Sequence, residues 1–180
     1  SQELMRRIWE THDGSGMMDP EVAVRIAENV MGIEDRMKRH NDNAAGIVRH
    51  LKMRRDELLS KVHYPGLNSH PNHDVANRLM TGFGGMVSFE LKDDDNGSKT
   101  RTFLNKLSQD KKDGEGIVSQ LVSLGTVDTL ICCPARSTHL RVPRQERLAQ
   151  GITDNLIRLS VGTEDVEDIV YSLERGFQAI

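Results

Sequence analysis

Cysteine, aromatic residues and long hydrophobic runs are all scarce in this 180-residue sequence. Its two cysteines, Cys132 and Cys133, are neighbours, and vicinal cysteines rarely bridge each other without strain. The sequence therefore predicts no disulfide framework and favours a reducing, cytoplasmic setting. Aromatic residues make up 4% of the chain and the formal net charge is -3, which together argue against a nucleic-acid partner. No apolar run approaches the length of a membrane span and no signal peptide is evident, so no membrane association is expected.

The length suits a single domain with a hydrophobic core, and no internal repeat is apparent. We expect an N-terminal arm or linker helix over residues 1–17 and one domain over residues 18–180. Residues 11–16 are rich in turn formers, which predicts that the first helix stops before them. Asp19 and Pro20 predict the start of a long helix, because Asp caps a helix N-terminus and Pro suits its first position. Gly32 is expected to bend or divide that helix.

Alternating or β-branched segments predict strands at residues 58–64, 86–91, 117–121, 129–133 and 156–161. Short helices are expected at 74–80, 102–107 and 143–150, and a longer amphipathic one follows Gly162, with either Thr163 or Asp165 as its N-cap. The polar run at 109–116 is typical of a mobile surface loop. Regular βαβ spacing is missing, so the pattern predicts an α+β fold, an antiparallel sheet with helices on one face, preceded by a long helix.

The segment from Leu156 to Val161 places one cation on an otherwise ordinary strand. Alternation puts Ile157 and Leu159 on an apolar face and Arg158 on the opposite face. A guanidinium there is either a solvated surface cation or an anion clamp, because its planar fork grips a carboxylate through two parallel hydrogen bonds. Periodicity leaves both interpretations open.

Other residues with reactive side chains are more simply explained as structural. His70 and His73 have ligand-like spacing, but Pro71 lies between them and no second pair accompanies them, so no metal site is expected. Cys132 and Cys133 lie on a predicted buried strand, where thiols behave as small hydrophobes.

Four stretches in order resemble one enzyme family, the pyridoxal-phosphate-dependent family of cysteine and methionine metabolism. They are His63-Tyr-Pro-Gly-Leu-Asn-Ser-His-Pro-Asn-His73, Gly82-Phe-Gly-Gly-Met-Val-Ser-Phe-Glu-Leu91, Ser123-Leu-Gly-Thr-Val-Asp-Thr-Leu-Ile131 continuing to Pro134-Ala-Arg-Ser-Thr-His139, and Asp154-Asn-Leu-Ile-Arg-Leu-Ser-Val-Gly-Thr-Glu-Asp-Val-Glu-Asp168. The family includes cystathionine γ-synthases, γ-lyases and β-lyases. The resemblance covers the chain from about Met18 and is to the small C-terminal domain of fold-type I pyridoxal-phosphate enzymes.

This resemblance assigns roles to three residues. The serine of the family's Ser-Leu-Gly motif and the arginine of its Leu-Ile-Arg-Leu-Ser motif hold the substrate carboxylate, which implies that role for Ser123 and Arg158. Thr138 is a weaker candidate for the same pocket. The implied substrates are sulfur-containing amino acids of the cystathionine or homoserine-derivative class.

The resemblance also implies what lies elsewhere. The family's Schiff-base lysine and its other cofactor contacts belong to a large N-terminal catalytic domain. Lys99 follows the polar turn Asn96-Gly97-Ser98, and no other lysine is expected in the Ser-x-x-Lys setting that the family's catalytic lysine has. We therefore expect no catalytic, cofactor-binding or metal-binding residue in this chain, pyridoxal phosphate only in a complete enzyme, and a homo-oligomer when complete.

Two departures from the family pattern support an alternative. The family's Arg-Gly-Leu-Lys-Thr motif is replaced here by Glu28-Asn-Val-Met-Gly32. The segment Asp110–Gly116 resembles an insertion. The alternative function is a non-catalytic interaction module or truncated relic of the family. Among activities, β-lyase is the alternative to γ-synthase or γ-lyase.

Overall fold

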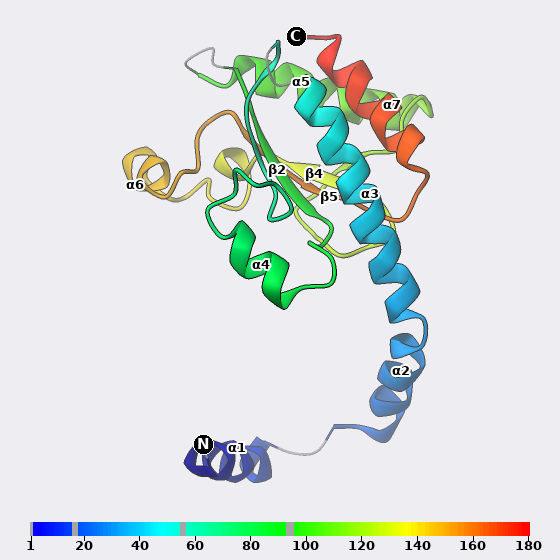
Figure 1. Cartoon of the computed structure of the whole chain (residues 1–180), viewed down its shortest axis with the longest axis vertical. Coiled ribbons are helices and arrows are strands. Elements are labelled where there is room, and N and C mark those ends of the chain that lie inside the picture. The colour runs from blue at the N-terminus through cyan, green and yellow to red at the C-terminus, as the bar shows by residue number, and fades with distance from the viewer. Residues whose placement is uncertain (1, 16–17, 55–56, 93–95) are drawn as a thin grey trace. The chain divides into compact units, whose positions relative to one another are not determined.

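The computed structural model describes residues 2–15, 18–54, 57–92 and 96–180 (Figure 1). The helices are α1 (Gln2–Ser15), α2 (Pro20–Val30), α3 (Ile33–Met53), α4 (His73–Leu79), α5 (Ser98–Asp113), α6 (Arg144–Ala149) and α7 (Val166–Phe177), with a 3-10 turn η1 (Pro134–Arg136). The strands are β1 (Leu59–His63), β2 (Met86–Leu91), β3 (Ser119–Gln120), β4 (Leu130–Cys132) and β5 (Leu156–Ser160). The chain forms two compact units, one up to Asp35 and one from Arg36 onward.

The first unit contains α1 and α2. The prediction that turn residues end the first helix is wrong for residues 11–15, which continue α1, while Gly16 lies outside the described residues. A glycine or polar residue weakens a helix by about 1 kcal/mol or less, so an established hydrogen-bond ladder can continue through it. The predicted start at Asp19 is confirmed, because its carboxylate accepts a hydrogen bond from the Glu21 amide at 2.8 Å.

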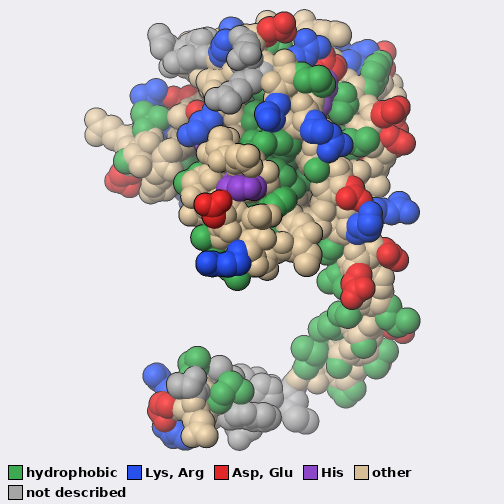
Figure 2. Space-filling view, in the orientation of Figure 1, with side chains coloured by type: hydrophobic (Ala, Val, Ile, Leu, Met, Phe, Trp, Pro, Cys, Tyr) green, Lys and Arg blue, Asp and Glu red, His purple; other side chains and the backbone are tan. Residues whose placement is uncertain are grey.

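Gly32 divides the long helix as predicted. Its φ of 83° is a left-handed conformation that favours glycine, and it separates α2 from α3. No side chain of α2 is buried, and Figure 2 shows hydrophobic side chains on the surface of this helix. Its apolar stripe is therefore uncovered.

The second unit is built on a five-stranded sheet in the order β1-β2-β5-β4-β3. Every neighbouring pair is antiparallel except β3 and β4, which are parallel. The predicted α+β class is confirmed, and the predicted antiparallel sheet is confirmed apart from the parallel pair of β3 and β4. The predicted strand at 117–121 is shorter than expected, since only Ser119–Gln120 pairs with β4.

Helices α3, α5 and α7 cover one face of this sheet. Figure 1 shows α3 crossing in front of the strands with α7 beside it, and the His50 ring of α3 bonds the Glu174 carboxylate of α7 at 2.6 Å. Phe89 of β2 meets Phe103 of α5 and Phe177 of α7 in the core, with each ring centroid 6.1 Å from that of Phe89. Aromatic burial of this kind supplies much of the hydrophobic stabilisation of a domain. The predicted apolar face of β5 is confirmed by the complete burial of Ile157 and Leu159.

Helix α5 corrects two predictions made from composition. It runs from Ser98 to Asp113, so the helix expected at 102–107 is much longer and most of the expected loop at 109–116 is helical. The physical reason is Asp110, whose side chain is 1% exposed and binds Arg175 of α7 through two hydrogen bonds of 2.9 and 3.0 Å. Lys106 adds a contact of 2.6 Å from one turn earlier. A buried ion pair between two helices thus stabilises helical structure in a segment whose polar composition predicts a loop.

The turn between β5 and α7 resolves another expectation. Asp165 caps α7, since its side chain accepts a hydrogen bond from the Glu167 amide at 2.9 Å, so Asp165 rather than Thr163 is the N-cap. Gly162 before it is fully enclosed: a Cβ built there would lie 2.6 Å from the Asp128 carbonyl carbon. None of the described helices is both long and apolar enough to cross a bilayer.

Candidate functional site

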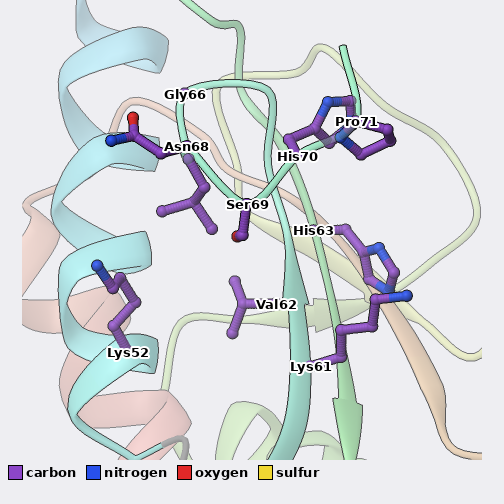
Figure 3. A pocket seen from close by; sticks show the side chains of 10 residues that line it. Lys52, Lys61, Val62, His63, Gly66, Asn68, Ser69, His70 and Pro71 are labelled. Carbon is purple, nitrogen blue, oxygen red and sulfur yellow. The ribbon is translucent and has the colours of Figure 1, made fainter. Parts of the chain in front are cut away.

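The sheet face opposite these helices carries polar side chains. Strand register aligns His63 of β1, Ser88 of β2, Arg158 of β5 and Cys132 of β4 in one row across the sheet. Directly paired residues of antiparallel strands point to the same side, so these four share the face away from the core. Figure 3 shows the alternation on β1, where His63 extends to the opposite side from Val62.

Arg158 is half-buried at the centre of this row. Its Nη2 donates to the carbonyl oxygens of Val122 and Ser123, at 2.5 and 3.3 Å. Its Nε is buried without a hydrogen-bond partner, and its Nη1 makes no hydrogen bond within the described part of the chain. Carbonyl dipoles satisfy N–H donors but leave the guanidinium charge without a counter-ion. A buried unpaired N–H costs about 1–3 kcal/mol.

The structure brings Ser123 next to Arg158, but the Ser123 backbone carbonyl makes the contact and its hydroxyl does not. The Ser123 carbonyl is the acceptor, and the residue lies exposed in the loop that follows β3. Thr138 follows η1, and among the described residues its hydroxyl is hydrogen-bonded to the ring of the next residue, His139, with 2.9 Å between the two atoms. No contact joins Thr138 to Arg158 in that part of the structure.

Arg136 is a residue that the sequence reasoning passed over. It lies in η1, its Nη2 donates to the Asn96 and Gly97 carbonyls at 3.1 Å each, and its buried Nε has no partner. It lines a cavity of about 150 Å³ together with Gln120, Leu121, Val122, Cys132, Cys133 and Ser137. The signal in the sequence was a cation two residues before Thr138, inside the stretch Pro134–His139 that carries the family resemblance.

A second polar group on the open face is the pair of His63 and Glu90. The His63 Nε2 lies 2.9 Å from one Glu90 oxygen, and the Thr153 hydroxyl donates to the other at 3.1 Å. The hydrogen bond from His63 is the largest cause that lowers the pKa of Glu90, followed by smaller contributions from Thr153 and Lys61. Together with Ser88 these residues border a hollow of about 560 Å³.

A larger hollow, of about 720 Å³, lies at the outer strand β1 (Figure 3). Lys52, Lys61 and His63 line it with the loop of residues 66–71. It is two strands from Arg158, so its size does not make it the site of the chemistry.

The loop histidines near this hollow have structural partners. The His73 Nδ1 lies 2.8 Å from the Pro65 carbonyl and the His70 Nδ1 accepts from the Asn72 amide at 3.2 Å. The described residues contain no group of three or more acidic, histidine or cysteine side chains that could hold a metal ion.

Cys132 and Cys133 are both free and buried, at 2% exposure each. Burial is the main cause that raises the pKa of the Cys133 thiol. The prediction of buried, unbridged cysteines is confirmed.

These features define an α+β sheet domain whose open face presents an arginine suited to an anionic ligand. Residues 2–178 match the family model described as Cys/Met metabolism PLP-dependent enzyme. The chain belongs to this family, and the resemblance seen in the sequence is confirmed.

Characterised relatives agree. The chain is 42% identical over 164 residues to an L-methionine gamma-lyase of Fusobacterium nucleatum, covering 91% of this chain and 38% of that protein. It is 36% identical over 179 residues to a cystathionine beta-lyase of Lactococcus lactis, covering 99% of this chain and 44% of that protein. The chain thus spans about two fifths of the length of these relatives.

Solved structures show the same fold. Cystathionine gamma-lyase from Lactobacillus plantarum complexed with L-serine matches with a TM-score of 0.70 and 39% identity, covering 83% of this chain and 36% of that one. Cystathionine gamma synthase from Xanthomonas oryzae pv. oryzae in complex with cystathionine matches with a TM-score of 0.71 and 34% identity, covering 82% and 35%.

The lysines of this chain do not fit a covalent pyridoxal-phosphate site. All eight lysines lie among the described residues, and none of them is buried. Lys111 does follow Ser108 at the spacing of the family's serine and lysine, which corrects the expectation that no lysine has that spacing. It is exposed near the end of α5, however, and donates to the Ile117 carbonyl at 3.0 Å. A cofactor lysine needs a dry pocket that lowers its pKa, and no lysine here has one.

Proposed function

We propose that this chain provides the part of the active site that binds the substrate carboxylate in a trans-sulfuration enzyme of the cystathionine γ-synthase or γ-lyase type. Arg158 is the main anchor, Ser123 a second donor and Thr138 a weaker contact. The observation that carries the proposal is the Arg158 guanidinium, which has no counter-ion among the described residues and a buried Nε without a partner.

A carboxylate can approach Arg158 through Nη1, which is not among the buried unpartnered atoms. To engage the planar fork fully it must also compete with the Val122 and Ser123 carbonyls for Nη2. A carboxylate wins that competition because it brings an opposite charge and can accept two parallel hydrogen bonds from the guanidinium, whereas each carbonyl is neutral and accepts from Nη2 alone. Release of the loop also brings the Ser123 hydroxyl within reach of the anion.

The role of this chain's residues is positioning. A carboxylate fixed at Arg158 on a rigid strand holds the substrate Cα in one place and orientation, which lowers the entropic part of the barrier. Pyridoxal phosphate supplies an electron sink for bonds made and broken next to that carbon. The lysine and the cofactor contacts belong, in this proposal, to an N-terminal catalytic domain outside the chain, and the complete enzyme is a homo-oligomer acting on sulfur-containing amino acids.

The proposal is compatible with more than one reaction of the family. The relatives include methionine gamma-lyase, cystathionine beta-lyase and cystathionine gamma synthase, and a carboxylate grip serves all of them. Cystathionine β-lyase activity is therefore the alternative activity.

Binding of L-serine to the chain tests the proposal directly. In two-dimensional ¹H–¹⁵N spectra of the arginine side chains, the Nε–H signal of Arg158 is expected to move on titration. Arg158→Ala should abolish binding, and Arg158→Lys should keep only part of it because an ammonium has no planar fork. The matched control is Arg141→Ala, which removes an exposed arginine from the loop after η1. Binding that survives Arg158→Ala unchanged would refute the role of Arg158.

Steady-state kinetics in a complete enzyme measure how much Arg158 and Ser123 contribute to catalytic efficiency. Loss of a charge-assisted, bidentate grip corresponds to about 2 to 3 kcal/mol. Arg158→Ala should then lower kcat/KM roughly 30- to 150-fold. Ser123→Ala should cost about tenfold, since one neutral donor is lost. The cofactor absorbance should stay nearly unchanged in both.

A non-catalytic interaction module is the second candidate. It is favoured by α2, whose apolar residues Val24, Ile26 and Val30 are exposed. This candidate predicts that L-serine does not bind and that Arg158 is dispensable. The coding sequence upstream of Ser1 separates the two as well: an open frame that continues into a segment with the cofactor lysine supports the enzyme.

A further inference from the structure

Arg136 and Arg158, both in the second unit, are the arginines with a buried Nε that has no hydrogen-bond partner among the described residues. Arg54, Arg147 and Arg175 each bind a carboxylate. Arg136 and Arg158 donate only to backbone carbonyls within the described residues, and each has a buried Nε that has no partner. Neither arginine therefore has a counter-ion among the residues that the structure describes.

Arg136 lines a cavity whose wall includes two neighbours of Arg158. Arg136 lines the space of about 150 Å³ directly, and Val122, whose carbonyl binds Arg158, forms part of its wall. Cys132, the cross-strand partner of Arg158, forms another part. The cavity is thus bounded by Arg136 on one side and by the immediate neighbours of Arg158 on the other.

The lining of the cavity suits a carboxylate. No acidic residue is among the described residues that line it. Gln120 offers an additional donor, because its carbonyl oxygen accepts from the Ser108 hydroxyl at 2.8 Å and its amide nitrogen is left unpaired within that part of the chain. A cavity of this volume has room for a group of about the size of benzene, so a terminal carboxylate with its neighbouring carbons fits.

We propose that Arg136 is a second anion anchor, which holds the distal carboxylate of a substrate whose first carboxylate is held by Arg158. The inference rests on the proposed function and names its substrate class: an α-amino acid whose side chain ends in a second carboxylate, as in cystathionine. A substrate with one carboxylate gains nothing from Arg136. Two anchors on different elements, η1 and β5, define the length of the substrate as well as its charge.

The chain itself, titrated with two ligands, tests this inference without any substitution. The Nε–H signals of Arg158 and Arg136, assigned from arginine-to-lysine variants, are followed during titration with L-serine and with L,L-cystathionine. L-Serine should move only the Arg158 signal, whereas cystathionine should move both. If cystathionine moves Arg158 alone, the second anchor is wrong and the first stands. If neither ligand moves Arg158, the proposed function fails and this inference fails with it.

Affinity measurements on variants show how much Arg136 contributes to the binding of cystathionine. Cystathionine should bind the chain about tenfold more tightly than L-serine, and Arg136→Gln should remove that advantage while changing the L-serine affinity less than twofold. Arg141→Gln, the control, should leave both affinities unchanged. Arg136 also anchors the turn at residues 96–97, so the melting temperature of Arg136→Gln is measured first. If the variant is unfolded, the decision rests on the wild-type spectra. Equal losses for both ligands would overturn the inference.

Discussion

The buried carboxylate of Asp110 makes a quantitative prediction about stability. Its two oxygens receive hydrogen bonds from Arg175 and Lys106, and the bonds from Arg175 are the largest cause that lowers its pKa from 3.8 to about 2. By linkage that difference corresponds to about 2.4 kcal/mol of folding free energy above the pKa of the unfolded state. The two cations are 24% and 35% exposed, and solvent screens them, so we expect a contribution of about 2 kcal/mol.

Asp110→Asn is the appropriate perturbation, because it keeps the shape and removes the charge. The free energy of unfolding at pH 7, measured by urea denaturation, should fall by about 2 kcal/mol. The control is Asp113→Asn on the same helix, whose carboxylate is exposed and receives a hydrogen bond from the Gln109 amide. Its effect should stay within about 0.5 kcal/mol.

The pH dependence makes the prediction sharper. A carboxylate whose pKa is lowered on folding stabilises the protein above the unfolded-state pKa, and that stability disappears as the pH falls through the folded-state pKa. The difference between wild type and Asp110→Asn should therefore be constant above about pH 5, be roughly halved near pH 3 and vanish towards pH 2. A difference that is absent at pH 7, or that persists unchanged at pH 2, would refute the ion-pair explanation.

Two further predictions concern packing. Gly162→Ala should destabilise the fold by about 2 to 3 kcal/mol, because the added Cβ would meet the backbone of Val127 and Asp128 and the Glu164 carboxylate; an unfolding free energy within 0.5 kcal/mol of wild type, by the same denaturation assay, would contradict this. Cys132 and Cys133 should not react with a water-soluble thiol reagent in the folded chain and should both react in urea, because both are buried and burial raises the pKa of the Cys133 thiol; rapid stoichiometric labelling of the native chain would show that they are accessible.

Local chemistry explains the parts of the fold that the sequence predicted well. Asp19 and Asp165 cap helices through their own side chains, and such capping involves residues only two or three positions apart. The faces of β5 follow from alternation, which is also a local pattern. Gly32 divides a helix because its backbone conformation suits glycine.

The predictions that failed depended on distant partners. Asp110 and Arg175 are separated by 65 residues, and nothing in the polar run around Asp110 indicates that a cation from another helix neutralises it. Composition alone therefore favoured a loop, since aspartate is rarely buried without such a partner. The parallel pairing of β3 with β4 is likewise a tertiary arrangement.

The candidate site was predictable to the same extent. Alternation placed Arg158 on the open face, and the resemblance indicated which anion it would hold. The carbonyls that now bind its Nη2 come from Val122 and Ser123, 36 and 35 residues away in the sequence. Arg136 was not predicted as a site residue. Its buried Nε without a partner and its position in the wall of a cavity are visible only in the three-dimensional structure.

The segment Asp110–Gly116 bears on whether a catalytic domain can dock on this chain. As an apparent insertion it suggested a departure from normal assembly, but it packs against α7: the Ser172 hydroxyl accepts a hydrogen bond from the Ile117 amide at 3.0 Å, and Arg175 holds Asp110 and Glu115. Because α5 and α7 pack on the core face of the sheet and Arg158 is on the opposite face, the segment lies on the side away from Arg158. An extra turn there stabilises the domain without obstructing the open face, so this departure leaves approach to the Arg158 face unobstructed.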